Sequence, residues 1–315
     1  MPGFASILNT GPNVPNEVAI QVYFTTGFDT VGMALYDKTT DSNNSEIVQS
    51  SEADPTGNLI FSSQLASTML MSFNAVFGFT KQLDPKSPKI DVSIVCPVYQ
   101  TVAATEGTNT TIASCSSPEN TWVYYLRLFL LSGADQDSLR IIQSQVGKEI
   151  TSITLEANDV RVGSSLAAYF DVEEHVPFVI YQHEVDGNDD VRQLYEYSMG
   201  SQSCKEPKPR PRVKNFCLRL THSLAIRIQN TDDAAKLTSV AAVHFHRMTY
   251  LYYMANDNEL RVITKVKGKW GTSSAVSGAN MVNDSSQITA VSSGEANHVF
   301  YTDKSGSPVH LMLPY

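Results

Sequence analysis

The sequence is short of long apolar runs and of basic residues, and each shortage excludes a class of function. No window of about 18 apolar residues occurs, so we expect no membrane span. The 23 Lys and Arg residues are outnumbered by 32 Asp and Glu residues, which gives a net charge of −9. Because nucleic-acid affinity depends on clustered basic side chains, we expect no nucleic-acid partner.

Signature motifs of common enzymes are also absent from the sequence. It contains no G-x-S-x-G, no H-E-x-x-H and no glycine-rich phosphate loop, so hydrolase, protease and nucleotide-binding functions have no support. No cysteine spacing is C-x-x-C, and two neighbouring histidines without a matching Asp or Cys make a poor metal site. We therefore predict neither a metal site nor a cofactor.

Cysteine is scarce, and the four residues fall into two local pairs. The pairs are Cys96 with Cys115 and Cys204 with Cys217. An even number in local pairs predicts two short-loop disulfides, although four cysteines allow three pairings and four unconnected thiols are the alternative.

Glycosylation sequons of the form N-x-S/T occur at Asn43, Asn109 and Asn283. The N-terminal stretch has neither the basic start nor the apolar segment of a signal peptide. Together with the cysteine pairs, the sequons favour the secretory pathway or the extracellular space, with the leader absent from the sequence as written. A cytoplasmic location is the alternative.

Short apolar strands with adjacent aromatic residues recur along the chain. They are QVYF at 21–24, VFGF at 76–79, WVYY at 122–125, FVIY at 178–181, YLYY at 250–253 and HVFY at 298–301. Their spacing is about 50 residues, in the range of propeller blades. Val, Ile, Leu, Tyr and Thr dominate the flanking segments, and Asn, Asp and Gly separate them, as in strands joined by turns.

The repeat predicts an all-β, six-bladed β-propeller that forms a single domain over residues 1–315. The apolar segment 62–77 falls where a blade is due, so we interpret it as strand rather than helix. We expect the N- and C-terminal strands to close the ring, with the N-terminal segment completing the last blade, since closure removes exposed sheet edges.

The segment 237–270, with TSVAAVHF, YLYY, ELRV and KGKW, resembles the fungal fucose-specific lectins. The resemblance implies six blades with a sugar site between neighbouring blades. In that family an Arg before the aromatic pair and a Glu in the following strand hold the fucose hydroxyls. Here the Arg position is occupied in four blades by Trp122, Phe178, Tyr250 and His298. The expected Glu positions hold Ile141, Gln193 and Val262, so we expect no fucose binding at the usual sites.

The chain is also similar to the fungal hetero-Diels–Alderases of tropolone–sesquiterpenoid biosynthesis, which share the lectin-like propeller without the repeated Arg and Glu. This resemblance implies a cofactor-independent enzyme that joins a polyketide-derived quinone methide to an alkene of a humulene-type terpene, forming a dihydropyran. Its partners are then two small molecules, and a homodimer is compatible with the pairing of related lectins. The alternatives are a divergent glycan-binding lectin and an interaction protein that uses the basic, proline-rich segment 205–214.

The candidate catalytic residues lie in VAAVHFHR. Alternation along a strand puts His244 and His246 on one face with Arg247 beside them, which would supply an acid, a base and an oxyanion donor. The acidic run 171–175 is either a source of general acids or a solvated turn. The candidate substrate-binding residues are Trp122, Tyr250, Tyr253 and His298. Core packing is the alternative for each of these side chains.

Overall fold

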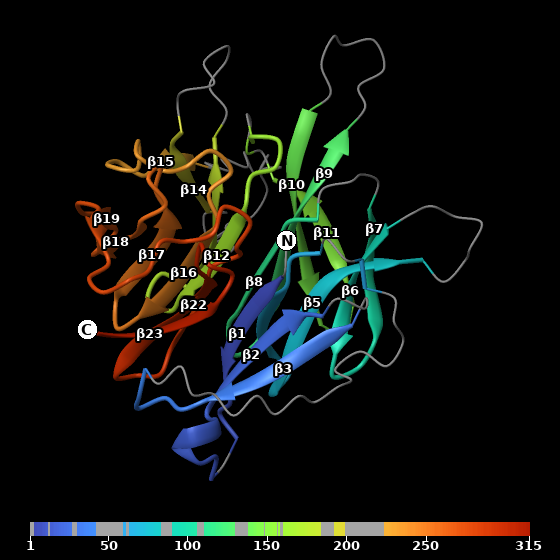
Figure 1. The fold of residues 1–315 in the computed structure, drawn as a ribbon. Coiled ribbons are helices and arrows are strands. Elements are labelled where there is room, and N and C mark those ends of the chain that lie inside the picture. The colour runs from blue at the N-terminus through green and yellow to red at the C-terminus, as the bar shows by residue number, and fades with distance from the viewer. Residues whose placement is uncertain are drawn as a thin grey trace, which may run out of the picture.

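The computed structural model describes residues 3–11, 13–26, 30–41, 59–60, 63–82, 90–105, 110–129, 138–147, 149–155, 157, 160–183, 192–198 and 224–315. These residues form six antiparallel sheets arranged in a ring, as Figure 1 shows. A single 3-10 turn, η1 (Asn16–Val18), is the helical element within these ranges. The six-bladed, all-β prediction is confirmed, including the strand interpretation of the segment 62–77.

The first three sheets follow the chain in order. Blade 1 holds β1 (Phe4–Leu8), β2 (Ile20–Thr25) and β3 (Val31–Tyr36). Blade 2 holds β4 (Ala66–Leu70), β5 (Phe73–Lys81), β6 (Ile90–Cys96) and β7 (Gln100–Thr105). Blade 3 holds β8 (Ile112–Ser116), β9 (Thr121–Phe129), β10 (Ser138–Val146) and β11 (Thr151–Thr154).

The remaining sheets continue the same order. Blade 4 holds β12 (Leu166–Asp171), β13 (Val176–Gln182), β14 (Leu194–Ser198) and β15 (Leu224–Arg227). Blade 5 holds β16 (Val240–Phe245), β17 (Met248–Met254), β18 (Leu260–Val266), β19 (Lys269–Trp270) and β20 (Ser274–Ala275). Blade 6 holds β21 (Thr289–Ser292), β22 (Ala296–Thr302) and β23 (Pro308–Pro314). The aromatic segments of the repeat are the second strands of the six blades.

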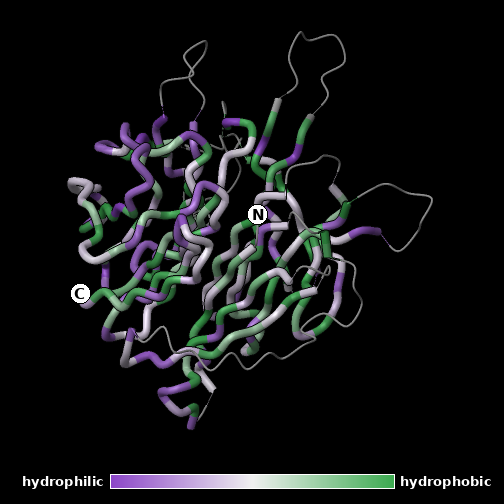
Figure 2. Tube along the Cα trace, in the orientation of Figure 1, coloured by the Kyte–Doolittle hydropathy of each residue, from purple (hydrophilic) through white to green (hydrophobic). Residues whose placement is uncertain are grey.

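Each hydrophobic cluster lies between two neighbouring blades. Alternate residues of a strand face opposite sides of its sheet, so one strand contributes to two clusters. In β13, Phe178 packs toward blade 5, whereas Val179 packs toward blade 3. Figure 2 shows apolar residues concentrated along the strands and hydrophilic residues in many of the connecting turns. Side-chain contacts between blades therefore hold the ring together.

The ring closes differently from the sequence-based expectation. β1 pairs with β2 in blade 1, and blade 6 is complete with three strands of its own, so the N-terminal segment does not join the last sheet. Side chains bridge the two blades instead. Ser6 N donates to Thr289 Oγ1 at 3.0 Å, and Phe4 N donates to Gln287 Oε1 at 2.8 Å. Gln287 Nε2 also donates to Leu65 O at 2.8 Å, which ties blade 6 to blade 2.

The predicted disulfide between Cys96 and Cys115 is wrong, because neither cysteine forms a disulfide. Cys96 ends β6 in blade 2, whereas Cys115 lies in β8 of blade 3, so closeness in sequence does not bring them to one sheet. Cys115 contacts Tyr124, and burial is the main cause that raises the pKa of its thiol. The second predicted pair, Cys204 and Cys217, lies outside the described residues, as does the segment 205–214.

Two of the three sequons, at Asn43 and Asn109, also lie outside the described residues. The third is in a turn, where Asn283 Oδ1 accepts hydrogen bonds from the backbone N and the hydroxyl of Ser285 at 3.0 and 2.9 Å. No helix among the described residues has the length and apolarity needed to cross a bilayer.

Candidate functional site

His244 lies near the end of β16 and faces blade 4. The alternation that places Val240 and Ala242 in the cluster between blades 4 and 5 puts His244 on that same side, as the sequence predicted. Its side chain is 6% exposed, and its ring stacks on Tyr169 of β12 with centroids 5.7 Å apart. The imidazole is therefore fixed by packing at the edge of the junction between the two blades.

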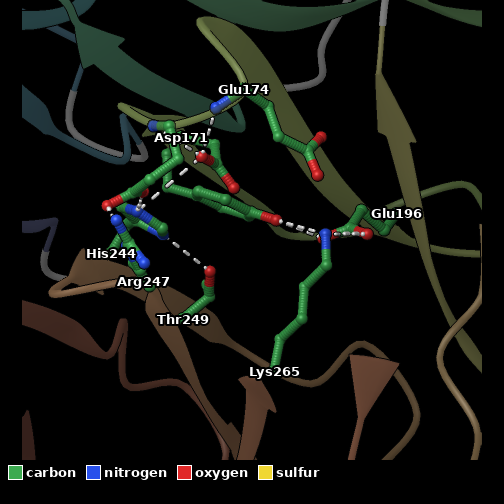
Figure 3. A network of polar contacts seen from close by, with 9 residues as sticks. Asp171, Glu174, Glu196, His244, Arg247, Thr249 and Lys265 are labelled. Carbon is green, nitrogen blue, oxygen red and sulfur yellow. Dashed lines mark hydrogen bonds and ion pairs between the residues drawn. The ribbon is translucent and has the colours of Figure 1, made fainter. Parts of the chain in front are cut away.

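Both ring nitrogens of His244 have polar partners, as Figure 3 shows. Nδ1 is 2.9 Å from Thr249 Oγ1, and Nε2 is 3.0 Å from Glu173 Oε2. Asp171 Oδ1 is 3.9 Å from Nε2. The hydrogen bond with His244 is the main cause that lowers the pKa of Glu173, which stands on an exposed turn. The arrangement pairs an imidazole with two carboxylates at the surface.

The turn 172–175 owes its shape to Asp171, the last residue of β12. Asp171 Oδ1 accepts the backbone N–H groups of Glu173 and Glu174 at 3.0 and 2.9 Å. Aspartate side chains commonly form this kind of local turn. His175 closes it with a φ of 56°. The turn places Glu173 beside His244, so one residue of the acidic run 171–175 contacts the imidazole while it stays exposed to solvent.

The structure separates His246 and Arg247 from the face of His244. β16 ends at Phe245, and both residues have positive φ angles, 48° and 62°, in the turn to β17. The prediction that His246 shares the face of His244 is wrong, because the turn interrupts the alternation. Arg247 is 80% exposed, with Nε 3.8 Å from Glu173 Oε1. Glu173 therefore has two nitrogen-bearing neighbours, His244 and Arg247, from one hairpin.

A buried ion pair lies deeper between the same two blades. Lys265 Nζ of β18 donates to Glu196 Oε2 of β14 at 2.8 Å and to the Tyr169 hydroxyl oxygen at 3.0 Å. Tyr169 donates to Glu196 Oε1 at 2.5 Å, and Trp270 Nε1 donates to Oε2 at 3.4 Å. Burial and the Glu196 carboxylate raise the pKa of Tyr169. Lys265 Nζ also lies 4.2 Å from the ring centre of Phe178.

Sequence reasoning missed both members of this pair. It included Glu196 in a predicted strand at 191–198 but assigned the expected Glu position to Gln193, whereas the strand in the structure is Leu194–Ser198 and carries Glu196. The signal was a glutamate between two tyrosines in LYEY, two residues after an apolar strand start. No sequence pattern marked Lys265, because its partner belongs to a different blade.

The four predicted substrate-binding residues lie at four different junctions. Trp122 stacks on Phe170 between blades 3 and 4, with centroids 5.5 Å apart. Tyr253 is buried between blades 4 and 5 and donates to Asp233 Oδ1 at 2.7 Å. Tyr250 is half-buried between blades 5 and 6. The structure therefore does not bring these residues together in one pocket.

His298, the fourth of these residues, lies at the junction of blades 6 and 1. Its Nδ1 is 2.9 Å from His310 Nε2, and the His310 ring stacks on Phe300 with centroids 4.5 Å apart. Tyr36 of blade 1 packs edge-on against His310. Burial is the largest cause that lowers the pKa of His298, to about 4. His298 is therefore buried in the contact between the last blade and the first, where the ring closes.

A pocket of about 100 Å³ lies at the centre of the ring. The first strands of all six blades line it, largely with small side chains such as Ser67, Ala113 and Ala241. Small-molecule sites usually occupy about 300–1,000 Å³. The central pocket is therefore too small for a sesquiterpene together with a second substrate.

No protein-family model matches the chain, and no curated protein sequence does. Several solved structures, however, match the chain. The lectin of Aleuria aurantia, described with a six-bladed β-propeller fold and a novel fucose recognition mode, matches with a TM-score of 0.63 and 15% identity, over 99% of this chain and 91% of the lectin. The chain has the fold of the fungal fucose lectins.

Two further solved structures are similar to the chain. A triple arginine-to-alanine mutant of AofleA from Arthrobotrys oligospora matches with a TM-score of 0.59 and 12% identity, over 100% of this chain and 83% of that one. SapL1 lectin in complex with alpha methyl fucoside matches with a TM-score of 0.54 and 17% identity, over 82% of each chain. At these identities the likeness establishes the propeller fold alone.

Proposed function

We propose that the chain is a cofactor-independent hetero-Diels–Alderase. It joins a quinone methide, formed from a hydroxymethyl-bearing tropolone or related polyketide, to an alkene of a humulene-type sesquiterpene. The product is a dihydropyran. The observation that carries this proposal is the His244 imidazole, nearly buried and held by hydrogen bonds between Thr249 and the exposed Glu173. It is an acid–base pair open to a substrate at the edge of the propeller.

The pair would act in the loss of water that creates the reactive diene. A proton on His244 Nε2 is delivered to the departing hydroxymethyl oxygen, and a carboxylate of Glu173 or Asp171 takes the proton of the ring hydroxyl. One water leaves, so the charges balance, and the proton then returns to the imidazole. Positioned groups of this kind accelerate proton transfer by about 10²–10⁴-fold.

The addition itself needs two partners held face to face rather than further proton transfer. The quinone methide oxygen and its terminal carbon each form one bond to the alkene, with no change in proton count. The hairpin that carries His244 also presents half-exposed rings on its other side. Phe245 stacks on Tyr315 with centroids 5.1 Å apart, and Tyr250 lies 5.8 Å from Tyr315. These rings lie on the opposite side of β16 from His244, so in this proposal the terpene binds beside the imidazole and not on this surface.

A turnover assay tests the proposal. The purified protein is incubated with a hydroxymethyl tropolone and a humulene-type alcohol, and adduct formation and its enantiomeric excess are followed by chiral chromatography. We expect a stereochemically pure adduct, and a rate about 10²–10⁴-fold lower in His244→Ala. A racemic product at the uncatalysed rate would rule out the proposal for these substrates.

The turn 172–175 offers a matched control for this assay. Glu173→Gln and Glu174→Gln remove the same charge from adjacent positions, but Glu173 alone hydrogen-bonds His244. We expect the first variant to lose at least about tenfold in rate, since it removes the acid–base partner. The second should stay near the wild-type rate. Equal losses in both would indicate a general effect of surface charge.

A divergent glycan-binding lectin is the second candidate. It is favoured by the surroundings of Glu196, whose carboxylate accepts hydrogen bonds from Lys265 and Trp270 between two blades. A carboxylate, a cation and an aromatic ring are groups of the kinds that bind sugars in lectins. Against it, Glu196 and Lys265 already pair with each other and are 3% and 8% exposed. A glycan array separates the two candidates, because the lectin predicts binding without turnover.

A further inference from the structure

Three metal-ligating atoms converge beside the turn 172–175, from two different blades. They are Asp171 Oδ1, Glu173 Oε2 and His244 Nε2, which lie within 4.8 Å of one another. The nitrogen is 3.0 Å from one carboxylate oxygen and 3.9 Å from the other. Donors about 2.1 Å from a tetrahedral zinc ion stand roughly 3.4 Å apart, so small side-chain rotations suffice to surround an ion.

The donors are oriented by a second set of contacts. Thr249 Oγ1 occupies the Nδ1 side of His244, which leaves Nε2 as the nitrogen that faces the carboxylates. Two backbone N–H groups fix the Asp171 carboxylate through Oδ1, an oxygen that they would share with the ion. The stacked ring of Tyr169 fixes the plane of the imidazole. Outer contacts of this kind set the tautomer and direction of metal ligands, and their loss commonly costs about 10–100-fold in affinity.

We propose that Asp171, Glu173 and His244 form a binding site for a divalent transition-metal ion of the zinc class. One imidazole and two carboxylates are a donor set that such ions accept, and three protein ligands leave further positions for water or another oxygen ligand. The imidazole favours zinc or cobalt over magnesium, which prefers oxygen ligands. Glu173 is 40% exposed and gives the ion access from solvent.

The sequence did not indicate this site. Within 240–247 there are two histidines and no carboxylate, and the expectation of no metal rested on that segment. The fold supplies the carboxylates from blade 4, about 70 residues earlier in the chain. If the proposed function is correct, an ion bound through Nε2 also blocks proton donation from that nitrogen. The metal would then inhibit turnover.

Direct binding is the test, with no substrate present. Tag-free, chelator-treated protein is titrated with Zn²⁺ by calorimetry, and with Co²⁺ by its visible absorption, which reports the coordination of the ion. We expect one ion per chain, with affinity at least about tenfold weaker in Asp171→Asn and His244→Ala, which remove ligands. Thr249→Val should weaken binding by about tenfold, since it frees the imidazole.

Three control variants keep the proposal falsifiable. His246→Ala and Glu174→Gln remove a neighbouring histidine and a neighbouring carboxylate without touching the three donors, and both should bind as the wild type does. Arg247→Ala removes a cation 3.8 Å from Glu173 and should tighten binding by about two- to threefold. Circular dichroism checks that each variant is folded.

The proposal is overturned if the wild type binds no ion. It is also overturned if His246→Ala weakens binding as much as His244→Ala does, because the ion would then sit on surface histidines. These results do not depend on turnover, so a failed enzyme assay leaves the metal site standing. Inhibition by Zn²⁺ in the turnover assay would connect the two proposals.

Discussion

The junction between blades 4 and 5 and the junction between blades 6 and 1 each carry a histidine that packs against other rings, and they use it in opposite ways. Between blades 4 and 5, His244 meets carboxylates at an edge that solvent reaches. Between blades 6 and 1, His298 meets a second histidine, His310, and is fully buried. Burial at the second junction lowers the pKa of His298 and disfavours its ionised form. The partner and the depth decide whether an interblade histidine can do chemistry or only pack.

The largest effect on stability should come from breaking the buried ion pair of Lys265 and Glu196 between blades 4 and 5. Lys265→Met leaves the Glu196 carboxylate buried without its cation, and we expect a loss of about 3–5 kcal/mol in unfolding free energy. Chemical denaturation measures it. The double variant Lys265→Met/Glu196→Gln should recover part of this loss, since no charge is left in the interior. A single variant as stable as the wild type would contradict the assignment of a buried, unscreened pair.

The second largest effect should be a loss of stability in acid, which we expect from His298 at the junction of blades 6 and 1. His298 has a pKa of about 4 in the folded chain, below its ordinary value near 6.5, mainly because of burial. The unfolded chain therefore takes up the proton first as pH falls, so this stability is present above pH 6.5 and is lost between about 6.5 and 4. The loss is roughly 3 kcal/mol, since about 2.5 pKa units separate the two values and each unit corresponds to about 1.4 kcal/mol.

Thermal unfolding between pH 7 and pH 4 follows this loss. His298→Phe keeps an aromatic ring at the junction and should flatten the dependence on pH relative to the wild type. The groups that face His298 are His310, Asp37 and the backbone of Lys38. His310→Phe is therefore the companion variant. An unchanged pH profile in both would show that other groups control acid sensitivity.

A smaller effect on stability is expected from the Tyr169 hydroxyl, which lies between His244 and the ion pair of Glu196 and Lys265. Tyr169→Phe keeps the ring that stacks on His244 but removes the hydrogen bonds to Glu196 and Lys265. We expect a loss of about 1–2 kcal/mol in stability, typical of a buried hydrogen bond to charged groups. Turnover and Zn²⁺ binding should change little. A large change in either would show that the ion pair positions His244.

The sequence was sufficient for the architecture and for part of the site. The aromatic second strands recur at a spacing that sets the number of blades, and alternation in β16 places His244 correctly. The sequence-based prediction failed where the position of a residue within a strand, or a contact between two blades, decides which side chains meet. Glu196 was missed because the expected glutamate was assigned to Gln193, three residues earlier, and His246 was misplaced because a turn interrupts the alternation. The partners of His244 come from a neighbouring sheet, which no local pattern encodes.

The way the ring closes also bears on how the chain folds. Every described sheet is built from strands that follow one another in sequence, and β1 stays in blade 1 rather than joining blade 6. Contacts within a blade are therefore comparatively local, which favours rapid formation of each sheet. Blades emerging from the ribosome can form in order, each packing on the one before it. The final event is then the docking of two finished sheets across the junction of His298 and His310, rather than the insertion of a last strand.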